Sequence, residues 1–179
     1  MAKNDIEYEL RVLNIEKKTV ETNIKALGGV LLAKQSFRRY VFDVIPKTVG
    51  QWLRLRTDGT KTTLTLKIIS SDDVDGTSEW EVEVDDFDKT AIILEMAGIT
   101  SKGYQENNRI EYKLLGARVA IDSWPQIPIY LEIEADDEKT VFECAEALGY
   151  AHSDLTGMNT QKIYSTYGID LDTTPNLKF

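Results

Sequence analysis

The sequence predicts an α+β protein in which about eight short antiparallel strands form one sheet and amphipathic helices cover its apolar face. Most of these strands alternate charged and aliphatic residues, which is typical of a strand with two unlike faces. The dipeptide Asp58-Gly59 lies between two such strands and favours a tight hairpin, hence antiparallel pairing. Three helical segments, each with apolar residues three or four positions apart, end before Gly28, Gly98 and Gly149.

The opening strand shows the alternation most clearly. Glu7, Glu9 and Arg11 fall on one face of residues 6–12, and aliphatic and aromatic residues fall on the other. The same period of two places charged residues on one face of almost every later strand. The predicted strands span, in order, residues 6–12, 38–44, 51–57, 62–69, 79–84, 109–115, 118–122 and 129–135.

The remaining segments predict helices and loops. Amphipathic spacing predicts helices over residues 14–27, 88–97 and 137–148, followed by a short helix near 159–167. The polar stretch 70–76 is expected to be a loop, and the tail 168–179 to be irregular. Trp80 and Trp124 are expected to make core or helix contacts.

Length and composition indicate one ordinary globular domain spanning residues 1–179, because 42% of the residues are hydrophobic and 28% are charged. The net charge of −9 argues against duplex nucleic acid as the main partner. A single cysteine excludes an internal disulfide and suits a reducing compartment. No run is long enough for a membrane span and no apolar signal region opens the chain, so a cytoplasmic protein is expected.

The charged face of the sheet has two alternative fates. It can face water on an open antiparallel sheet, which is the common outcome. Alternatively the sheet closes, with helices outside and the charged face lining a tunnel, since about eight strands can enclose a ligand-holding interior.

The charges themselves suggest a ligand for such an interior. Glu-x-Glu occurs at Glu7 and Glu9, again in the run from Glu79 to Glu83, and in residues 129–135. Carboxylates this close repel each other unless a cation lies between them, and Mg²⁺ prefers oxygen ligands and substrate phosphates. Arginine forks match phosphate oxygens. Acidic and basic strands on one inward surface therefore suit a metal-bound polyphosphate.

The ordered set of motifs resembles the CYTH family, the triphosphate tunnel metalloenzymes. The motifs are Glu7-x-Glu9-x-Arg11, Leu53-Arg54-Leu55-Arg56, Leu64-Thr65-Leu66-Lys67, Glu79-x-Glu81-x-Glu83, Asp122 and Leu131-Glu132-Ile133-Glu134, and the resemblance covers roughly residues 1–165. The family includes class IV adenylyl cyclases, thiamine triphosphatases and inorganic triphosphatases. Its opening motif usually ends in Lys, where this chain has Arg11.

The resemblance implies an eight-stranded antiparallel closed β-tunnel with a charged interior and helices packed outside, which holds a triphosphate and Mg²⁺ or Mn²⁺. The implied metal-binding residues are Glu7, Glu9, Asp122, Glu132 and Glu134. The implied substrate-binding residues are Arg11, Arg54, Arg56, Lys67, Arg109, Arg118 and Lys162. Glu9, Lys67 and Glu134 are expected to be catalytic, and Glu79, Glu81 and Glu83 are expected to line the tunnel.

Three functions remain open on these grounds. The first is metal-dependent hydrolysis of inorganic triphosphate, thiamine triphosphate or a nucleoside triphosphate. The second is a class IV-type adenylyl cyclase, in which the ribose 3′-hydroxyl of ATP attacks the α-phosphorus and pyrophosphate leaves. The third is a non-catalytic polyphosphate or nucleotide binder. The expected partner is a small triphosphate, with neither duplex nucleic acid nor membrane, and a homodimer is left open.

Overall fold

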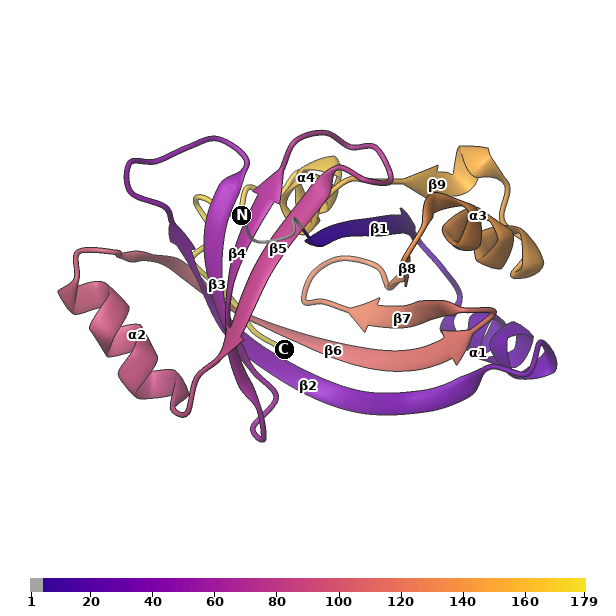
Figure 1. Cartoon of the computed structure of the whole chain (residues 1–179), viewed down its shortest axis with the longest axis horizontal. Coiled ribbons are helices and arrows are strands. Elements are labelled where there is room, and N and C mark those ends of the chain that lie inside the picture. The colour runs from indigo at the N-terminus through magenta and orange to yellow at the C-terminus, as the bar shows by residue number, and fades with distance from the viewer. Residues whose placement is uncertain (1–4) are drawn as a thin grey trace.

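The computed structural model describes residues 5–179 and is a closed β-barrel with helices on its outside (Figure 1). The barrel strands are β1 (Asp5–Val12), β2 (Val30–Asp43), β3 (Gln51–Thr57), β4 (Thr62–Ile69), β5 (Thr77–Glu83), β6 (Ser101–Leu114), β7 (Ala117–Ser123) and β8 (Tyr130–Ala135). The helices are α1 (Lys17–Ala26), α2 (Phe87–Met96), α3 (Glu138–Ala147) and α4 (Thr160–Thr166), with a 3₁₀ turn at His152–Asp154. Two short strands, β9 (Leu155–Thr156) and β10 (Asn176–Leu177), add to the sheet.

The strands follow one another around the barrel in the order β6-β2-β3-β4-β5-β1-β8-β7, and β7 pairs again with β6. Every one of these neighbouring pairs is antiparallel. Because the last strand pairs with the first, the barrel closes on itself. The predicted α+β fold class, a closed eight-stranded antiparallel tunnel with helices outside, is therefore confirmed.

The apolar face of the strands points outward, toward the helices. Val20 and Ile24 of α1 and Val141 and Cys144 of α3 are buried in one cluster with aliphatic residues of β1, β7 and β8. On the first strand, Leu10 belongs to this cluster whereas its neighbours Glu9 and Arg11 line the interior. The period of two in the sequence thus separates an outer apolar layer from an inner charged one.

Helix α2 covers β2 and β3 at the other end of the barrel. Its Phe87 and Leu94 pack with Phe42 of β2 and Leu55 of β3. Figure 1 shows α2 on the opposite side of the molecule from α1 and α3. Helices α1, α2 and α3 therefore cover two separate apolar regions outside the barrel, whereas α4 contributes residues to the wall of the interior.

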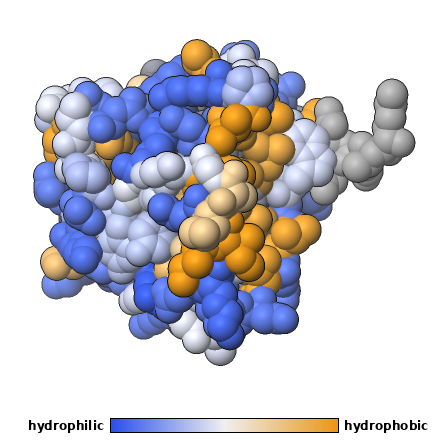
Figure 2. Space-filling view, turned by 90° about the vertical axis from the view of Figure 1, so that its left-hand side faces the viewer, coloured by the Kyte–Doolittle hydropathy of each residue, from blue (hydrophilic) through white to orange (hydrophobic). Residues whose placement is uncertain are grey.

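The outward side of α2 is also apolar. Ile92, Ile93 and Met96 are exposed there, and Figure 2 shows an apolar band among polar residues on this side of the molecule. Within residues 5–179, none of the helices is long and apolar enough to cross a membrane.

Two strands are longer than their sequence pattern indicates. The prediction began at residue 38 for β2 and at 109 for β6, yet the strands begin at Val30 and Ser101. A register shift between Leu31 and Ala33 breaks the period of two in β2, and residues 101–108 are mostly polar. Each extension pairs mainly with the predicted part of the other strand: residues 30–35 of β2 lie opposite residues 109–113 of β6, and residues 101–106 of β6 lie opposite residues 38–42 of β2. Tertiary pairing therefore decides the conformation of both extensions.

The helix boundaries and the tail also differ from the prediction. Helix α1 begins at Lys17 because Glu16 caps it, accepting hydrogen bonds from the N–H groups of Lys18 and Thr19. The tail predicted as irregular forms β10, which runs parallel to β6 and buries Leu177 completely.

Candidate functional site

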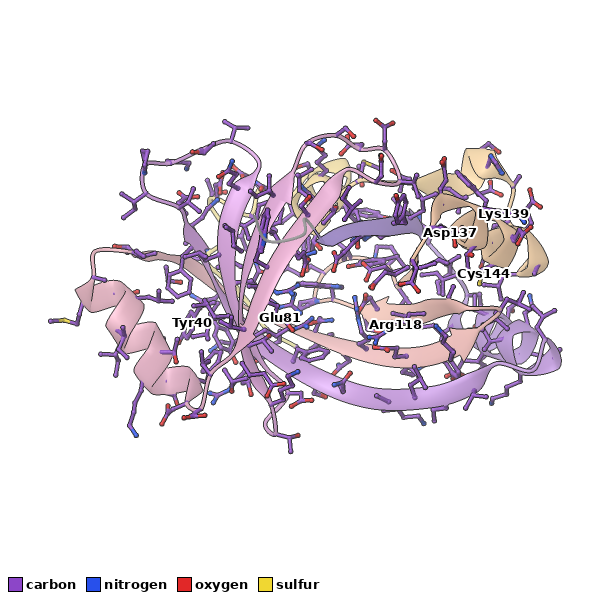
Figure 3. The ribbon with its side chains drawn as sticks, in the orientation of Figure 1. Tyr40, Glu81, Arg118, Asp137, Lys139 and Cys144 are labelled. Atoms are coloured by element: carbon purple, nitrogen blue, oxygen red, sulfur yellow. The ribbon has the colours of Figure 1, made fainter. Side chains whose placement is uncertain are left out.

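The barrel encloses a cavity of about 1060 Å³ with charged walls. Nearly all of the site residues predicted from the sequence line it, which brings together groups from β1, β3, β4, β5, β6, β7, β8 and α4. The predicted residues on the wall are Glu7, Glu9, Arg11, Arg54, Arg56, Lys67, Glu79, Glu81, Arg109, Arg118, Glu132, Glu134 and Lys162. In Figure 3, Glu81 and Arg118 lie within the barrel, whereas Asp137, Lys139 and Cys144 lie on the α3 side.

Arg11 lies at the centre of the carboxylates on β1 and β8. Its Nη2 is 2.9 Å from Glu9 Oε2, its Nε is 2.8 Å from Glu132 Oε2, and its Nη1 donates to the Met158 carbonyl at 3.1 Å. Glu9 also accepts a hydrogen bond from the hydroxyl of Thr77 at 3.0 Å. All of these side chains are at least nine-tenths buried, so Arg11 neutralises two carboxylates away from water.

The pKa values of this group follow from its pairing. Burial opposes ionisation of Glu132, but the guanidinium groups of Arg109 and Arg11 hold the pKa of its carboxyl well below the usual range. Burial likewise opposes ionisation of Glu9, and Arg11 and Lys67 lower its pKa nevertheless. Burial disfavours the charged form of Arg11, but Glu9 and Glu132 raise its pKa further. These groups are therefore ionised at neutral pH.

The negative charges of Glu134 and Glu7 are balanced less well by nearby basic side chains. Burial and then the negative charges of Glu7, Glu132 and Glu9 raise the pKa of Glu134 to about 7. Burial likewise raises the pKa of Glu7, although Lys67 Nζ lies 3.7 Å from its Oε2. Four carboxylates thus repel one another in one part of the cavity.

The donor chemistry of this carboxylate cluster, defined as Glu7, Glu9, Glu132 and Glu134, fits a hard divalent cation. Within the part of the chain that the structure describes, however, no three Asp, Glu, His or Cys residues already converge as metal ligands. In the structure these carboxylates have basic partners instead: Arg11 pairs with Glu9 and Glu132, and Lys67 pairs with Glu7.

The basic wall lies on β3, β4 and β6. Arg54 Nη2 is 3.4 Å from Glu79 and 3.6 Å from Glu81, and Lys67 pairs with Glu79 as well. Arg56 is 4.0 Å from Glu81, and its guanidinium lies 4.6 Å from the Phe37 ring centroid. Burial, and then the charges of Arg54 and Arg109, lower the pKa of Arg56 to about 9.

Two predicted residues do not line the cavity. Asp122 is completely buried behind Arg109, whose Nε and Nη2 are 3.0 and 2.5 Å from its carboxylate, and it also accepts from Asn107 at 3.0 Å. In the structure Asp122 orients a phosphate-binding candidate and is not open to a metal ion. Glu83, the last residue of β5, has a side chain that is 70% exposed and pairs with Lys61.

Two further candidates lie at the edges of the site. Arg118 lines the cavity but is 62% exposed, and its nearest acidic partner is Glu111 at 3.5 Å. Lys162 of α4 reaches Asp72 at 2.5 Å, so α4 is tied to the loop between β4 and β5. Both side chains remain accessible to a ligand from the cavity.

Sequence reasoning missed Arg39 and Asn107, and it did not place Trp124 on the cavity wall. Arg39 lies on β2 opposite Arg56 of β3, 6% exposed and lining the cavity, with its guanidinium 4.5 Å from the Trp124 ring centroid. Its neighbour Arg38 points outward and pairs with Asp88. The dipeptide Arg38-Arg39 by itself does not indicate which of the two arginines faces the interior. The pairing of Arg39 with Arg56 in the β2–β3 register does indicate it. Trp124 is buried against Tyr164 of α4, as the core or helix contact expected for it.

The fold and the site define a closed β-tunnel whose inner wall carries a carboxylate cluster facing several basic side chains. The CYTH domain model matches residues 5–167, and the chain belongs to the CYTH domain family. This confirms the resemblance seen in the motifs.

Solved structures of low sequence identity share the fold. A conserved hypothetical protein from Pyrococcus furiosus is 20% identical, with 88% of this chain and 99% of that chain covered and a TM-score of 0.77. A putative adenylate cyclase from Vibrio parahaemolyticus is 14% identical, with 91% and 99% covered and a TM-score of 0.76. A putative adenylyl cyclase from Hippeastrum, described as having a dominant triphosphatase activity, is 19% identical, with 93% and 98% covered and a TM-score of 0.60. No curated protein sequence matches the chain.

Proposed function

We propose that the chain is an enzyme that hydrolyses a triphosphate-containing substrate inside its tunnel, with Mg²⁺ or Mn²⁺ as cofactor. One observation carries the proposal: a cavity of about 1060 Å³ inside the barrel brings basic side chains of β3, β4 and β6 opposite the carboxylate cluster of β1 and β8. A small polyanion needs the first set, and a divalent cation that accompanies it needs the second. Inorganic triphosphate, thiamine triphosphate and nucleoside triphosphates all present the required phosphates.

The basic residues bind and orient the phosphates in this proposal. Arg54, Arg56 and Lys67 exchange their present carboxylate partners for phosphate oxygens, and Arg109 exchanges Glu132 while it keeps Asp122. These basic groups stabilise the charge that develops on equatorial and leaving oxygens. Asp122 keeps the Arg109 fork in position during this exchange, because its two contacts lie behind the guanidinium. Arg118 and Lys162 close the outer parts of the cavity around the substrate.

The carboxylate cluster would hold the metal ion. A bound Mg²⁺ or Mn²⁺ supplies Lewis-acid polarisation of the phosphate and orients the attacking water. Without a metal ion, burial and the neighbouring carboxylates raise the pKa of Glu134 to about 7, and a bound cation would lower it again. Glu134 would then be ionised at neutral pH and able to accept a hydrogen bond from the attacking water. The walls of the tunnel exclude competing water from the remaining phosphates.

The second candidate is cyclase chemistry, which the descriptions of two structurally similar proteins favour. The structures from Vibrio parahaemolyticus and Bacillus halodurans are both described as putative adenylate cyclases. Both reactions use the same phosphate grip, but the cyclase must also hold a ribose and a base so that the 3′-hydroxyl reaches the α-phosphorus. The Hippeastrum protein, described with a dominant triphosphatase activity, supports ranking hydrolysis first.

One assay set separates the functions. The protein is incubated with Mg²⁺ or Mn²⁺ and tripolyphosphate, thiamine triphosphate or ATP, and orthophosphate, pyrophosphate and cyclic AMP are measured. Orthophosphate release supports the hydrolase, and cyclic AMP with stoichiometric pyrophosphate supports the cyclase. Binding without turnover under either metal identifies a non-catalytic binder and refutes both enzymes.

The matched variants are Glu9→Gln, Glu134→Gln and Glu83→Gln. We expect the first two to lower kcat at least a hundredfold, because each removes a charge from the carboxylate cluster. Glu83→Gln makes the same chemical change on β5 outside the cavity and should keep nearly full activity. Retention of most activity by both cluster variants would remove the metal assignment.

A further inference from the structure

Arg39 is a buried cation without a counter-ion. Among the described residues 5–179 it takes part in no ion pair, and the one hydrogen bond of its guanidinium runs from Nη2 to Asn107 Oδ1. It is only 6% exposed, and the guanidinium stacks 4.5 Å from the centroid of the buried Trp124 ring. A guanidinium held this deeply normally has an acidic partner, because removing its hydration costs several kcal/mol.

Neighbouring positive charges further destabilise the charged form of Arg39. Burial, and then repulsion by Arg56, Arg54 and Arg109, lower its pKa well below the usual value. The one acid that acts on it noticeably, Asp122, is already bound at 3.0 and 2.5 Å by Arg109 and at 3.0 Å by Asn107. The protein therefore supplies positive charge here without the negative charge that would balance it.

Buried polar atoms without a hydrogen-bond partner also occur on this wall of the cavity. Arg39 Nε and Trp124 Nε1 are buried and have no hydrogen-bond partner, and both residues line the cavity. Each of these nitrogens can only donate, so the missing group is an acceptor. Arg54 Nε and Thr63 Oγ1 on the same wall are also unpaired. Buried polar groups are almost always satisfied in folded proteins, and such a concentration on one cavity wall indicates a ligand.

The missing acceptor is anionic and lies away from the metal end. A neutral acceptor would satisfy the N–H groups but would leave the charge of Arg39 uncompensated. Arg39 adjoins Arg56 across the β2–β3 register, and the strand order places β2 on the opposite side of the barrel from β1, which carries Glu7 and Glu9. A phosphoryl group bound there therefore lies on the wall opposite β1.

We propose that Arg39 and the Trp124 N–H form an additional oxyanion subsite, which binds the end phosphoryl group of an inorganic polyphosphate at the side of the tunnel away from the carboxylate cluster. This inference rests on the proposed function, because the rest of the polyphosphate lies along the basic wall described above. An organic triphosphate carries an esterified phosphate at that end, with less charge and with a bulky group attached. The subsite therefore selects inorganic tripolyphosphate over nucleoside triphosphates.

The direct test is calorimetric binding of tripolyphosphate in EDTA, where turnover plays no part. Arg39→Gln should weaken binding about ten- to hundredfold, the range for losing charge-assisted contacts. The matched control is Arg38→Gln, one residue away on the outer face, with a side chain that is 47% exposed; its affinity should equal that of the wild type. ATP binding should weaken less than threefold in Arg39→Gln. Equal tripolyphosphate affinity of wild type and Arg39→Gln would overturn the proposal.

Thermal unfolding separates binding from a structural role. In the absence of anion, Arg39→Gln should unfold at or above the wild-type temperature, because an uncompensated buried charge is removed; a clear drop would mean that Arg39 serves packing, against the proposal. Trp124→Phe keeps the ring beneath Arg39 but removes the donor, and should weaken tripolyphosphate binding about threefold or more. Orthophosphate and sulfate complete the series, and affinity for either as high as for tripolyphosphate would contradict selection of a polyphosphate.

The outcome is independent of the hydrolase assay. A wild-type protein that binds tripolyphosphate through Arg39 in EDTA, yet releases no orthophosphate with Mg²⁺ or Mn²⁺, keeps the subsite and refutes the hydrolase. Hydrolysis of tripolyphosphate combined with unchanged binding by Arg39→Gln refutes the subsite and keeps the hydrolase.

Discussion

At the scale of single residues, the cavity is a set of charges that are balanced unequally. Arg11 holds Glu9 and Glu132 with contacts of 2.7 to 2.9 Å, and both carboxyls have a lowered pKa as a result. Glu134 faces the same cluster without an ion pair among the described residues, and its pKa rises. The negative charge of Glu134 thus lacks a paired cation within the protein, and a metal ion held by the carboxylate cluster would supply one.

This imbalance gives the metal-free protein a pH-dependent weakness. Glu134 has a pKa of about 7 in the folded state, compared with 4.5 for an unperturbed glutamate. Its contribution to stability is fully present below 4.5 and is lost as the pH rises through 7, by up to about 3 kcal/mol. Glu134→Gln removes this dependence. The Tm of the variant minus that of the wild type, measured in EDTA, should therefore be larger at pH 8 than at pH 5.

Glu83→Gln is the control for this measurement, because its carboxylate lies outside the cavity and is 70% exposed. Its difference from the wild type should stay small at both pH values. If wild type and Glu134→Gln lost stability in parallel between pH 5 and pH 8, the repulsion assigned to Glu134 would be wrong.

At the scale of elements, period-two alternation determines which side chains share the cavity. The strands with strict alternation, such as β3 and β5, were predicted close to their observed bounds, and their inward residues with them. The long strands β2 and β6 were predicted only in part, because a register shift near Leu31 and a polar stretch hide the pattern. Arg39, by contrast, was missed although it lies inside the predicted strand 38–44, and its inward direction is seen in its pairing with Arg56 of β3.

Other site features depend on contacts that no local pattern encodes. The burial of Asp122 behind Arg109 requires the β6–β7 register, in which the two residues are directly opposed. Glu83 is exposed at the last residue of β5, although it continues the alternation of Glu79 and Glu81 without interruption. Sequence alternation therefore predicts the face of a residue but not its depth or its partner.

Strand β10, in the tail after α4, packs against residues that hold the site in position. Leu177 of β10 is completely buried with Trp124, Tyr164 and Tyr130, so it helps to fix the ring beneath Arg39. Leu177→Ala should lower the stability by about 2–5 kcal/mol, as for other buried leucines, which corresponds to a Tm decrease of roughly 5–15 °C. Phe179→Ala, two residues away and 66% exposed, should change the Tm by only about 1 °C. Equal small effects would show that β10 does not anchor this region.

At the scale of the whole molecule, the acidic and basic side chains of the tunnel wall neutralise one another. The chain carries a net charge of −9, yet its inner wall pairs basic strands with acidic strands across the barrel, as Arg54 with Glu79 and Arg109 with Glu132. A polyphosphate that draws the basic groups away leaves the carboxylates unpaired, and a divalent cation that takes the carboxylates leaves the basic groups unpaired. Each ligand therefore prepares the tunnel for the other.

This exchange predicts cooperative binding of metal and polyanion. Mn²⁺ alone should raise the Tm only slightly, because it must displace Arg11 and Lys67 from the carboxylates. A non-hydrolysable imidotriphosphate alone should raise it moderately. Together they should stabilise the protein by about 1–3 kcal/mol more than the sum of the separate effects, the usual range of coupling between sites. The affinity of the imidotriphosphate for Mn²⁺ in solution, measured without protein, is the reference. A strictly additive result after this correction would mean that the two halves of the wall do not exchange partners, and that the carboxylates and the basic residues act as separate sites.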